Sequence, residues 1–214
     1  MSSLLLIWIV IAGFVYLMSP LEQLRKLLSS SILSRNFAAI IALQSMLWSL
    51  DVELISGLSL HFLMITTATL VIGLRLTCLA GLASLLLMSA AGMLMPELIA
   101  EQWLLRILPA AAITYTSLLL VRHYLPHHLF IYIFVNAFIT AAIAITCSIL
   151  CLAAWYAWSG AYTGDEIQHH LLRMLPLMLF PEAMLNGMVI TVMVIYKPEW
   201  VRTYQDLDYL GPDN

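Results

Sequence analysis

The feature that most constrains this chain is a series of apolar runs, each long enough to cross a lipid bilayer. A membrane-spanning helix needs roughly 20 apolar residues, and breaks at charged and turn-forming residues leave about seven such runs. Their approximate limits are 3–19, 33–50, 54–73, 76–95, 103–121, 129–158 and 172–196. The runs are continuous rather than alternating, which favours helices as the spanning structure. We therefore predict an all-α, polytopic integral membrane protein, a bundle of about seven transmembrane helices that forms one domain over residues 1–214.

The composition excludes a soluble protein and argues against several classes of function. Of the 214 residues, 63% are hydrophobic and 10% are charged, whereas soluble domains carry about 25% charged residues. The sequence has no run of basic residues, so nucleic-acid binding has no electrostatic support. It also has no P-loop, HExxH, GxSxG or Cys-x-x-Cys motif. We therefore do not expect an enzyme, and if the chain drives uptake, ATP hydrolysis must come from separate ATPase subunits.

The distribution of charge predicts an orientation in the membrane. Seven of the nine Lys and Arg residues fall in or beside loops that would share one side, and Arg106 and Arg173 are the exceptions. The seven are Arg25, Lys26, Arg35, Arg75, Arg122, Lys197 and Arg202. The opposite loops carry Asp51, Glu53, Glu97, Glu101, Asp165 and Glu166. The positive-inside rule places the basic side in the cytoplasm, so we predict an N-terminus outside, a C-terminus inside and an odd number of spans.

Three segments depart from the pattern of a simple span. The run at 3–19 has no basic region before it and no clear cleavage site, which favours a retained helix over a signal peptide. The connector 21–31, LEQLRKLLSSS, has the pattern of an amphipathic helix at the membrane interface. The last run contains Pro176 and Pro181, which predict a kink or a break in the helix.

The few polar residues inside the runs are the candidate functional residues. His61 and Gln44 fall at similar depths, roughly 12 Å below the predicted outer surface at 1.5 Å per residue. Glu182 and Asn186 lie in the last run, where an interruption at the preceding proline would free backbone groups for coordination. An ionisable group in a span is by default a functional candidate, although membrane histidines and amides also commonly bond to a neighbouring helix. For Glu182, a structural hydrogen bond and a substrate role are equal alternatives.

Two stretches of the sequence resemble a known family of transport proteins. One contains His61 and reads GLSLHFLMITTATLVIGLRLTCLAGLASLLLMSAAGML. In it, a glycine-containing segment leads to the histidine, then to threonine-rich residues, a glycine and an apolar helix. The other contains Glu182 and reads PLMLFPEAMLNGMVITVMVIYKPEW. Both stretches are similar to the CbiM-type permeases of energy-coupling-factor cobalt and nickel transporters, and together they cover about a third of the chain.

The resemblance implies a substrate-capture subunit for a divalent transition metal, cobalt or nickel, in a bacterial inner membrane. Such a subunit works with a separate transmembrane coupling subunit and with cytoplasmic ATPase subunits. By position, His61 corresponds to the metal-ligating histidine of the family. The family begins Met-His, whereas this chain begins Met1-Ser2-Ser3, so the resemblance is to a divergent member. We expect the amine of Met1 and the side chain of Gln44 to complete the metal shell.

Two other functions remain open on the sequence alone. A non-transporting membrane assembly or interaction protein would keep the same fold without the metal site. A membrane-embedded enzyme, which is the less favoured alternative, would use Glu182 and His61. Metal content and the presence of transport partners distinguish these functions from the transport hypothesis.

Overall fold

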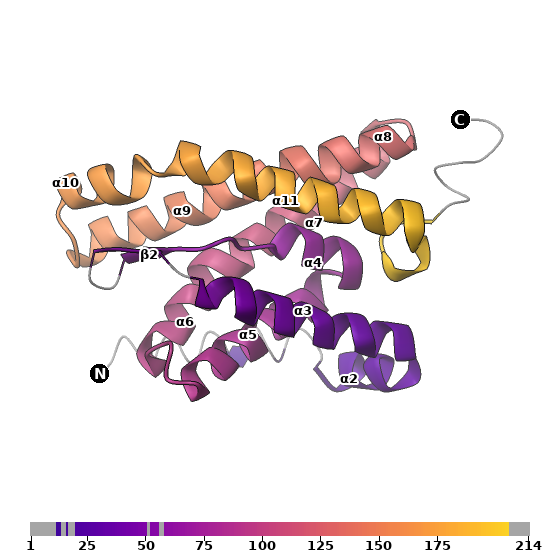
Figure 1. Ribbon diagram of the computed structural model, residues 1–214, viewed down its shortest axis with the longest axis horizontal. Coiled ribbons are helices and arrows are strands. Elements are labelled where there is room, and N and C mark those ends of the chain that lie inside the picture. The colour runs from indigo at the N-terminus through magenta and orange to yellow at the C-terminus, as the bar shows by residue number, and fades with distance from the viewer. Residues whose placement is uncertain (1–11, 14–15, 17–19, 51, 56–57, 206–214) are drawn as a thin grey trace.

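The structure is a computed structural model that describes residues 12–13, 16, 20–50, 52–55 and 58–205 (Figure 1). It is a helical bundle with one short two-stranded hairpin among the described residues. The predicted span at 3–19 lies outside the described residues apart from residues 12, 13 and 16. Met1, a predicted metal ligand, also lies outside them.

Three helical segments among the described residues are long and apolar enough to cross a membrane. The first, Pro96–Tyr124, consists of η1 (Pro96–Leu98), α6 (Ile99–Gln102), the π-helical turn η2 (Trp103–Ile107) and α7 (Leu108–Tyr124). The second, Leu129–Ser159, consists of α8 (Leu129–Ile131), the π-helical segment η3 (Tyr132–Ile139) and α9 (Thr140–Ser159). The third, Gly164–Tyr196, consists of α10 (Gly164–Glu166), the π-helical turn η4 (Ile167–Leu172) and α11 (Leu175–Tyr196). These helices confirm the predicted helical runs 103–121, 129–158 and 172–196.

The prolines of the last run interrupt the helix less than predicted. A short turn at Arg173 and Met174 separates η4 from α11, and Pro176 lies in the first turn of α11. Proline is tolerated there because the first amides of a helix have no partner within it. The helix continues through Pro181 without interruption.

Two further helices lie beside one another on the other side of the bundle. α3 (Ser31–Ser49) packs against α5 (Leu74–Ala90), which has 17 residues and is apolar but short for a span. The preceding α2 (Pro20–Ser29) meets α3 at a bend of 114°. Taken together, the two helices are long and apolar enough to form a fourth, broken span. On α2 the side chains of Leu21 and Leu28 are both 82% exposed. Exposed leucines on a helix that turns sharply away from α3 agree with the predicted interfacial helix at 21–31.

The predicted helical span at 54–73 is wrong in its first half. The chain there forms the antiparallel strands β1 (Val52–Ile55) and β2 (Leu58–Leu60), and a helix, α4 (Ile65–Ile72), forms only after them. The signal in the sequence is the dipeptide Ser56-Gly57 between two short runs, which is typical of a hairpin turn. α4 ends at Gly73, whose φ of 86° lies in the left-handed region that glycine adopts most readily.

The short helix α4 lies at the centre of the bundle. All eight of its residues are buried, and α3, α5, α7, α9 and α11 contact it (Figure 1). At 1.5 Å per residue it is about 12 Å long, which is far less than the roughly 30 Å of bilayer hydrocarbon. It is therefore a helix enclosed by protein rather than a separate span.

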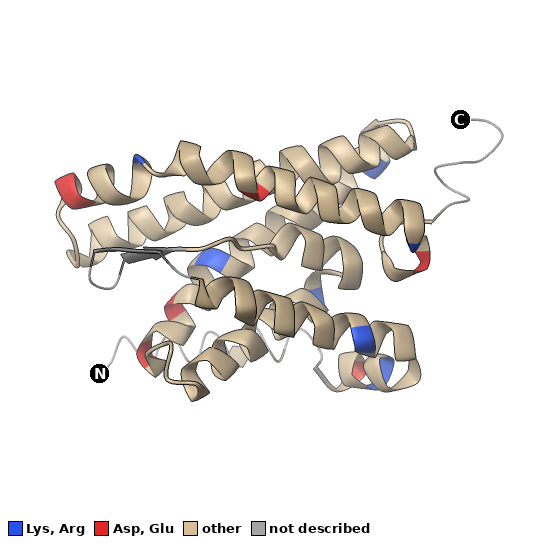
Figure 2. Cartoon of the chain, viewed as in Figure 1, with Lys and Arg blue, Asp and Glu red and all other residues tan. Residues whose placement is uncertain are grey.

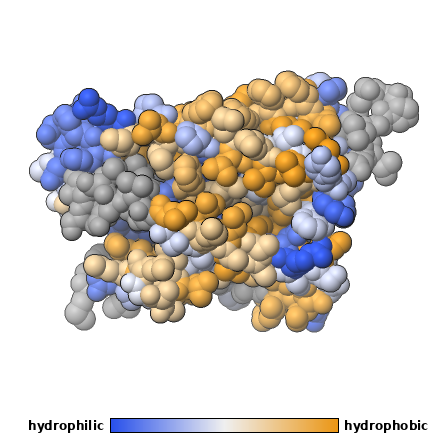
Figure 3. Space-filling view, in the orientation of Figure 1, coloured by the Kyte–Doolittle hydropathy of each residue, from blue (hydrophilic) through white to orange (hydrophobic). Residues whose placement is uncertain are grey.

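The surface has the distribution expected of a membrane protein. On the face shown in Figure 3, hydrophobic residues cover the middle and hydrophilic residues gather toward the two ends. Most basic residues lie toward one end of the bundle, and acidic residues gather toward the other (Figure 2). The predicted orientation depends on this segregation of basic and acidic residues. Which end of the bundle faces the cytoplasm stays a prediction.

Candidate metal-capture site

The predicted ligand His61 lies in the extended segment that joins β2 to α4. Its imidazole is partly buried, and its ring centroid lies 5.3 Å from that of Trp48 at the end of α3. Its Nε2 atom lies 2.8 Å from Nη1 of Arg106, and its Nδ1 atom lies 3.4 Å from the carbonyl oxygen of Phe62. Both ring nitrogens of His61 thus contact polar atoms of the protein.

A small cavity of about 150 Å³ adjoins His61. Its lining comes from α3, the segment between β2 and α4, α5, the turn after α5, and α6. The lining residues are Trp48, Ser49, His61, Leu85, Met88, Met93, Leu94 and Gln102. Two buried polar atoms of the lining, Oε1 of Gln102 and Nε1 of Trp48, have no hydrogen-bond partner among the described residues. A water molecule occupies roughly 30 Å³ in the liquid, so the cavity has room for a partly hydrated metal ion.

The chemistry of the lining suits a late transition metal. Imidazole is the commonest protein ligand for such ions, and His61 supplies it. The thioethers of Met88 and Met93 and the amide oxygen of Gln102 are weaker donors in the same lining. Within the described part of the chain, no group of three or more His, Cys, Asp or Glu side chains is arranged to hold a metal. A metal at this cavity would therefore depend strongly on His61.

Arg106 is the residue of this site that the sequence interpretation missed. It lies in the π-helical turn η2, its side chain is 5% exposed, and its guanidinium donates to Nε2 of His61. Arginine remains charged in proteins and only donates hydrogen bonds, so Nε2 is the acceptor and its lone pair is engaged. The signal was present in the sequence, because Arg106 is a charged residue inside an apolar run and an exception to the charge pattern.

Glu182 lies on α11 and is 2% exposed. Its Oε2 accepts a hydrogen bond from the backbone amide of Leu63 at 2.9 Å, and its Oε1 accepts one from that of Met64 at 2.8 Å. These amides precede the first turn of α4, where the helix dipole favours a negative group. Met64 has a φ of 53°, which is uncommon for a residue other than glycine. Glu182 therefore fixes the strained segment that follows His61.

Asn186, one turn further along α11, completes this arrangement. Its Nδ2 donates to Oε1 of Glu182 at 2.9 Å, and its Oδ1 accepts from both the backbone amide and the hydroxyl of Thr67 at 2.8 Å. The two side chains thus supply acceptors for three backbone amides around the N-terminal end of α4. Inside a membrane protein such amides must find internal partners. Both residues support the position of His61, and neither lines the cavity.

Gln44 lies close to the predicted site but outside the cavity lining. It is 1% exposed on α3, one helical turn before Trp48. Its Oε1 accepts from the hydroxyl of Ser84 at 3.4 Å, and its Nε2 has no partner among the described residues. The structure therefore brings His61 together with Trp48, Gln102 and Arg106, and it leaves Gln44 buried between α3 and α5.

Comparison with known proteins identifies the family. Residues 1–200 match the model of the family described as "Cobalt uptake substrate-specific transmembrane region", CbiM. Because the match covers most of the 214 residues, the chain belongs to this family. The chain matches no curated protein and no solved structure. The family is that of a transmembrane component of cobalt uptake. The long apolar helices of the chain agree with such a multi-pass membrane protein.

Proposed function

From its membership of the cobalt-uptake family, we propose that this chain is the substrate-capture permease subunit of an energy-coupling-factor-type transporter. Its substrate is a divalent transition-metal ion, cobalt or nickel. Its partners are a transmembrane coupling subunit and separate ATPase subunits in a bacterial inner membrane. The sequence has no nucleotide-binding motif, which supports the assignment of ATP hydrolysis to separate subunits.

The observation that carries the proposal is the position of His61 beside the cavity. The imidazole is one of the lining groups, and the unpartnered amide oxygen of Gln102 belongs to the same lining. Glu182 and Asn186 hold the backbone that follows the histidine, so its orientation is fixed before a metal arrives. Ligands positioned by surrounding hydrogen bonds bind metals more tightly than loose ones. In this proposal the Met1 amine and Gln44 are supplementary donors.

Capture requires Arg106 to leave Nε2 of His61. A guanidinium and a metal ion cannot share the same lone pair, and two cations at a few ångströms repel each other. We therefore propose that metal entry displaces the Arg106 side chain, so that the arginine holds the imidazole in the metal-free protein. The π-helical turn that carries Arg106 is a form of helix found frequently at functional sites.

The proposal is tested by metal accumulation in cells that lack their own cobalt and nickel uptake. Such cells would express the chain with the coupling and ATPase subunits of its own genome, and intracellular cobalt and nickel would be measured by elemental analysis. Accumulation is expected with the complete set and not with the His61→Ala variant. His123→Ala, at the far end of α7, is the matched control and should accumulate metal like the wild type. Equal accumulation with His61→Ala would contradict the proposed site.

A non-transporting assembly or interaction protein is the second candidate. The observation in its favour is the engagement of His61 by a buried arginine, which also suits a purely structural histidine. The purified chain would then hold no cobalt or nickel after incubation with either ion. A stoichiometric metal content by elemental analysis would exclude this alternative.

A further inference from the structure

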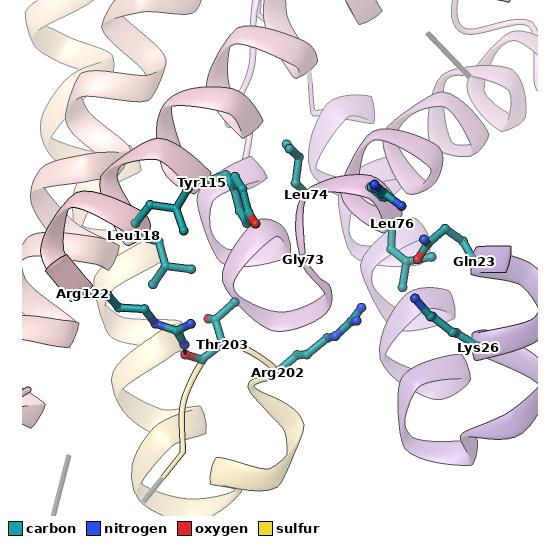
Figure 4. Close-up of a pocket in the computed structure, with 12 residues that line it drawn as sticks. Gln23, Lys26, Gly73, Leu74, Leu76, Tyr115, Leu118, Arg122, Arg202 and Thr203 are labelled. Atoms are coloured by element: carbon teal, nitrogen blue, oxygen red, sulfur yellow. Dashed lines mark hydrogen bonds between the residues drawn. The ribbon is translucent and has the colours of Figure 1, made fainter. Parts of the chain in front are cut away.

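A second cavity, of about 480 Å³, adjoins Gly73 at the C-terminal end of α4, whereas His61 precedes the N-terminal end of that helix. Figure 4 shows the residues that line this cavity. Its walls come from α2, the junction of α4 with α5, α7 and the C-terminal segment after η5 (Pro198–Trp200). Four basic side chains contribute to this lining, namely Lys26, Arg75, Arg122 and Arg202. The cavity is therefore lined by groups from segments far apart in the sequence.

The charge around the cavity is strongly unbalanced. Among the described residues, the acidic group paired with this cluster is Glu22, whose carboxylate lies 2.6 Å from Nζ of Lys26 and 4.0 Å from Nη1 of Arg75. Glu22 does not line the cavity. Counted over the described residues, four cations and one neighbouring carboxylate leave a net positive charge on the wall. Such a cavity favours an anion and disfavours a metal cation or an apolar ligand.

The backbone adds donors to the same wall. Gly73, Leu74, Arg75 and Leu76 line the cavity, and they form the start of the 17-residue helix α5. No side chain caps this helix, since its N-cap is Gly73. The first amides of a helix have no partner within it and carry the positive end of its dipole. An uncapped helix start beside several cations is a suitable site for a phosphate oxygen.

Two polar side chains complete the donor set. Gln23 is 3% exposed, lines the cavity and directs its amide toward the cavity in Figure 4, without a hydrogen bond to any described residue. The hydroxyl of Tyr115 also points into the cavity. The amide N–H groups of Gln23 and the hydroxyl of Tyr115 are donors that a ligand with acceptor oxygens can bind.

Two of the arginines are held in place by the fold. Nη2 of Arg122 donates to the carbonyl oxygen of Thr203, and Nη1 of Arg202 donates to that of Ile72 at 3.2 Å. A guanidinium has five N–H donors, so each arginine keeps donors for a ligand. Anchored arginines lose little side-chain freedom when they bind phosphate.

We propose that this cavity binds a phosphate group, either the headgroup of an anionic phospholipid or free inorganic phosphate. The cations, the amides at the uncapped start of α5 and the amide of Gln23 are all donors that phosphate oxygens accept. The position agrees with a lipid source, because basic pockets between membrane helices bind anionic headgroups. The exposed leucines of the adjoining α2, Leu21 and Leu28, would contact the acyl chains. This inference does not depend on metal transport.

The test uses the full chain, purified in a neutral detergent and depleted of lipid. Its unfolding temperature is followed by tryptophan fluorescence with dioleoylphosphatidylglycerol, with dioleoylglycerol, which lacks the phosphate, and with inorganic phosphate. A ligand at about 100 times its Kd should raise the unfolding temperature by roughly 5–10 °C in a chain of this size. A shift with the phospholipid alone identifies a headgroup site, and an equal shift with inorganic phosphate identifies a site for the free ion.

The key variant is the double substitution Lys26→Gln and Arg75→Gln, which spares the two anchored arginines. Each removed cation should weaken phosphate binding about fivefold. Arg25→Gln, an exposed residue on α2 outside the cavity, is the matched control and should bind like the wild type. Arg75→Lys keeps the charge and should bind within a few-fold of the wild type. The unfolding transition of the double variant without ligand shows whether that variant is folded. No shift with either phosphate source, an equal shift with dioleoylglycerol, or unchanged binding by the double variant would overturn the proposal.

Discussion

Nη1 of Arg106 lies 2.8 Å from Nε2 of His61, so a buried cation contacts the atom through which the imidazole would bind a metal. The arginine comes from a π-helical turn of one long helix, and the histidine comes from the segment before the enclosed helix α4. The contact defines the metal-free arrangement, because both the arginine and a metal ion need the same lone pair.

Replacement of Arg106 by glutamine should strengthen metal binding. The substitution removes a positive charge beside the ligand, and a repulsion of even about 1.4 kcal/mol corresponds to a tenfold change in affinity. We expect Arg106→Gln to bind cobalt about tenfold more tightly or better in a calorimetric titration. Arg106→Lys keeps the charge and is the control, with an affinity near that of the wild type. Weaker binding by Arg106→Gln would mean that the arginine supports the metal site instead of competing with it.

Glu182→Gln should destabilise the protein. Both carboxyl oxygens of Glu182 accept hydrogen bonds, and a glutamine in their place directs an NH₂ group at a backbone amide. A buried donor left without a partner costs about 1–3 kcal/mol, which should lower the unfolding temperature measurably in detergent. Glu199→Gln, at an exposed position, is the control. An unfolding temperature unchanged from the wild type would show that the contacts to Leu63 and Met64 contribute little.

The pair of Glu182 and Asn186 should behave as one unit. Asn186→Ala removes the acceptor for Thr67 and one donor to Glu182. Because the two side chains share a network, the double variant should lose less stability than the sum of the single losses. Thermal unfolding of the four proteins in this cycle measures the coupling, and strict additivity would argue against a shared network.

Gly187→Ala should disturb the packing of α11 against η3. A Cβ at this position would lie 2.6 Å from Cδ2 of Phe138, and overpacking of this kind costs about 1–3 kcal/mol. The additional substitution Phe138→Leu should restore part of the lost stability. Gly164→Ala, where no atom lies within 4 Å of the new Cβ, is the control. If Gly187→Ala unfolds at the same temperature as that control, the helices are less closely packed than the structure indicates.

The predicted orientation can be tested with single cysteines at the two ends of the bundle. In a background with Cys78, Cys147 and Cys151 replaced, Ser29→Cys follows Arg25 and Lys26 on α2, and Gly164→Cys precedes Asp165 and Glu166 on α10. Both positions are exposed. The positive-inside rule predicts that a membrane-impermeant maleimide added to intact spheroplasts labels only Gly164→Cys. Labelling of Ser29→Cys alone would reverse the orientation.

The sequence predicted the parts of the fold that follow from long apolar runs. The helices at 103–121, 129–158 and 172–196 were found because continuous hydrophobicity over that length is typical of a membrane-spanning helix. The segment 54–73 was assigned wrongly, because hydropathy alone does not separate a span from a hairpin followed by a short buried helix. The turn signal at Ser56-Gly57 was present and was outweighed by the apolar composition.

The candidate metal site, like the fold, could be predicted from the sequence only in part. His61 and Glu182 were singled out because polar groups in apolar runs are costly unless they are used. The contact of Arg106 with His61 was not predictable, although the charge of Arg106 stood out in an apolar run, because tertiary packing alone brings the two residues together. Gln102 lines the same cavity for the same reason. The hydrogen bonds from Leu63 and Met64 to Glu182 join residues more than 100 positions apart, a pairing that spacing in the sequence does not indicate.

The central claim is that His61 captures the metal, and calorimetric titration of cobalt into the purified protein tests it most directly. The titration is made with the wild type, with His61→Ala and with His123→Ala as a histidine control, after circular dichroism has shown equal helix content. We predict one cobalt ion bound per chain by the wild type and by His123→Ala, and no binding by His61→Ala. Cobalt binding by His61→Ala equal to that of the wild type, or no binding by the wild type, would contradict the account.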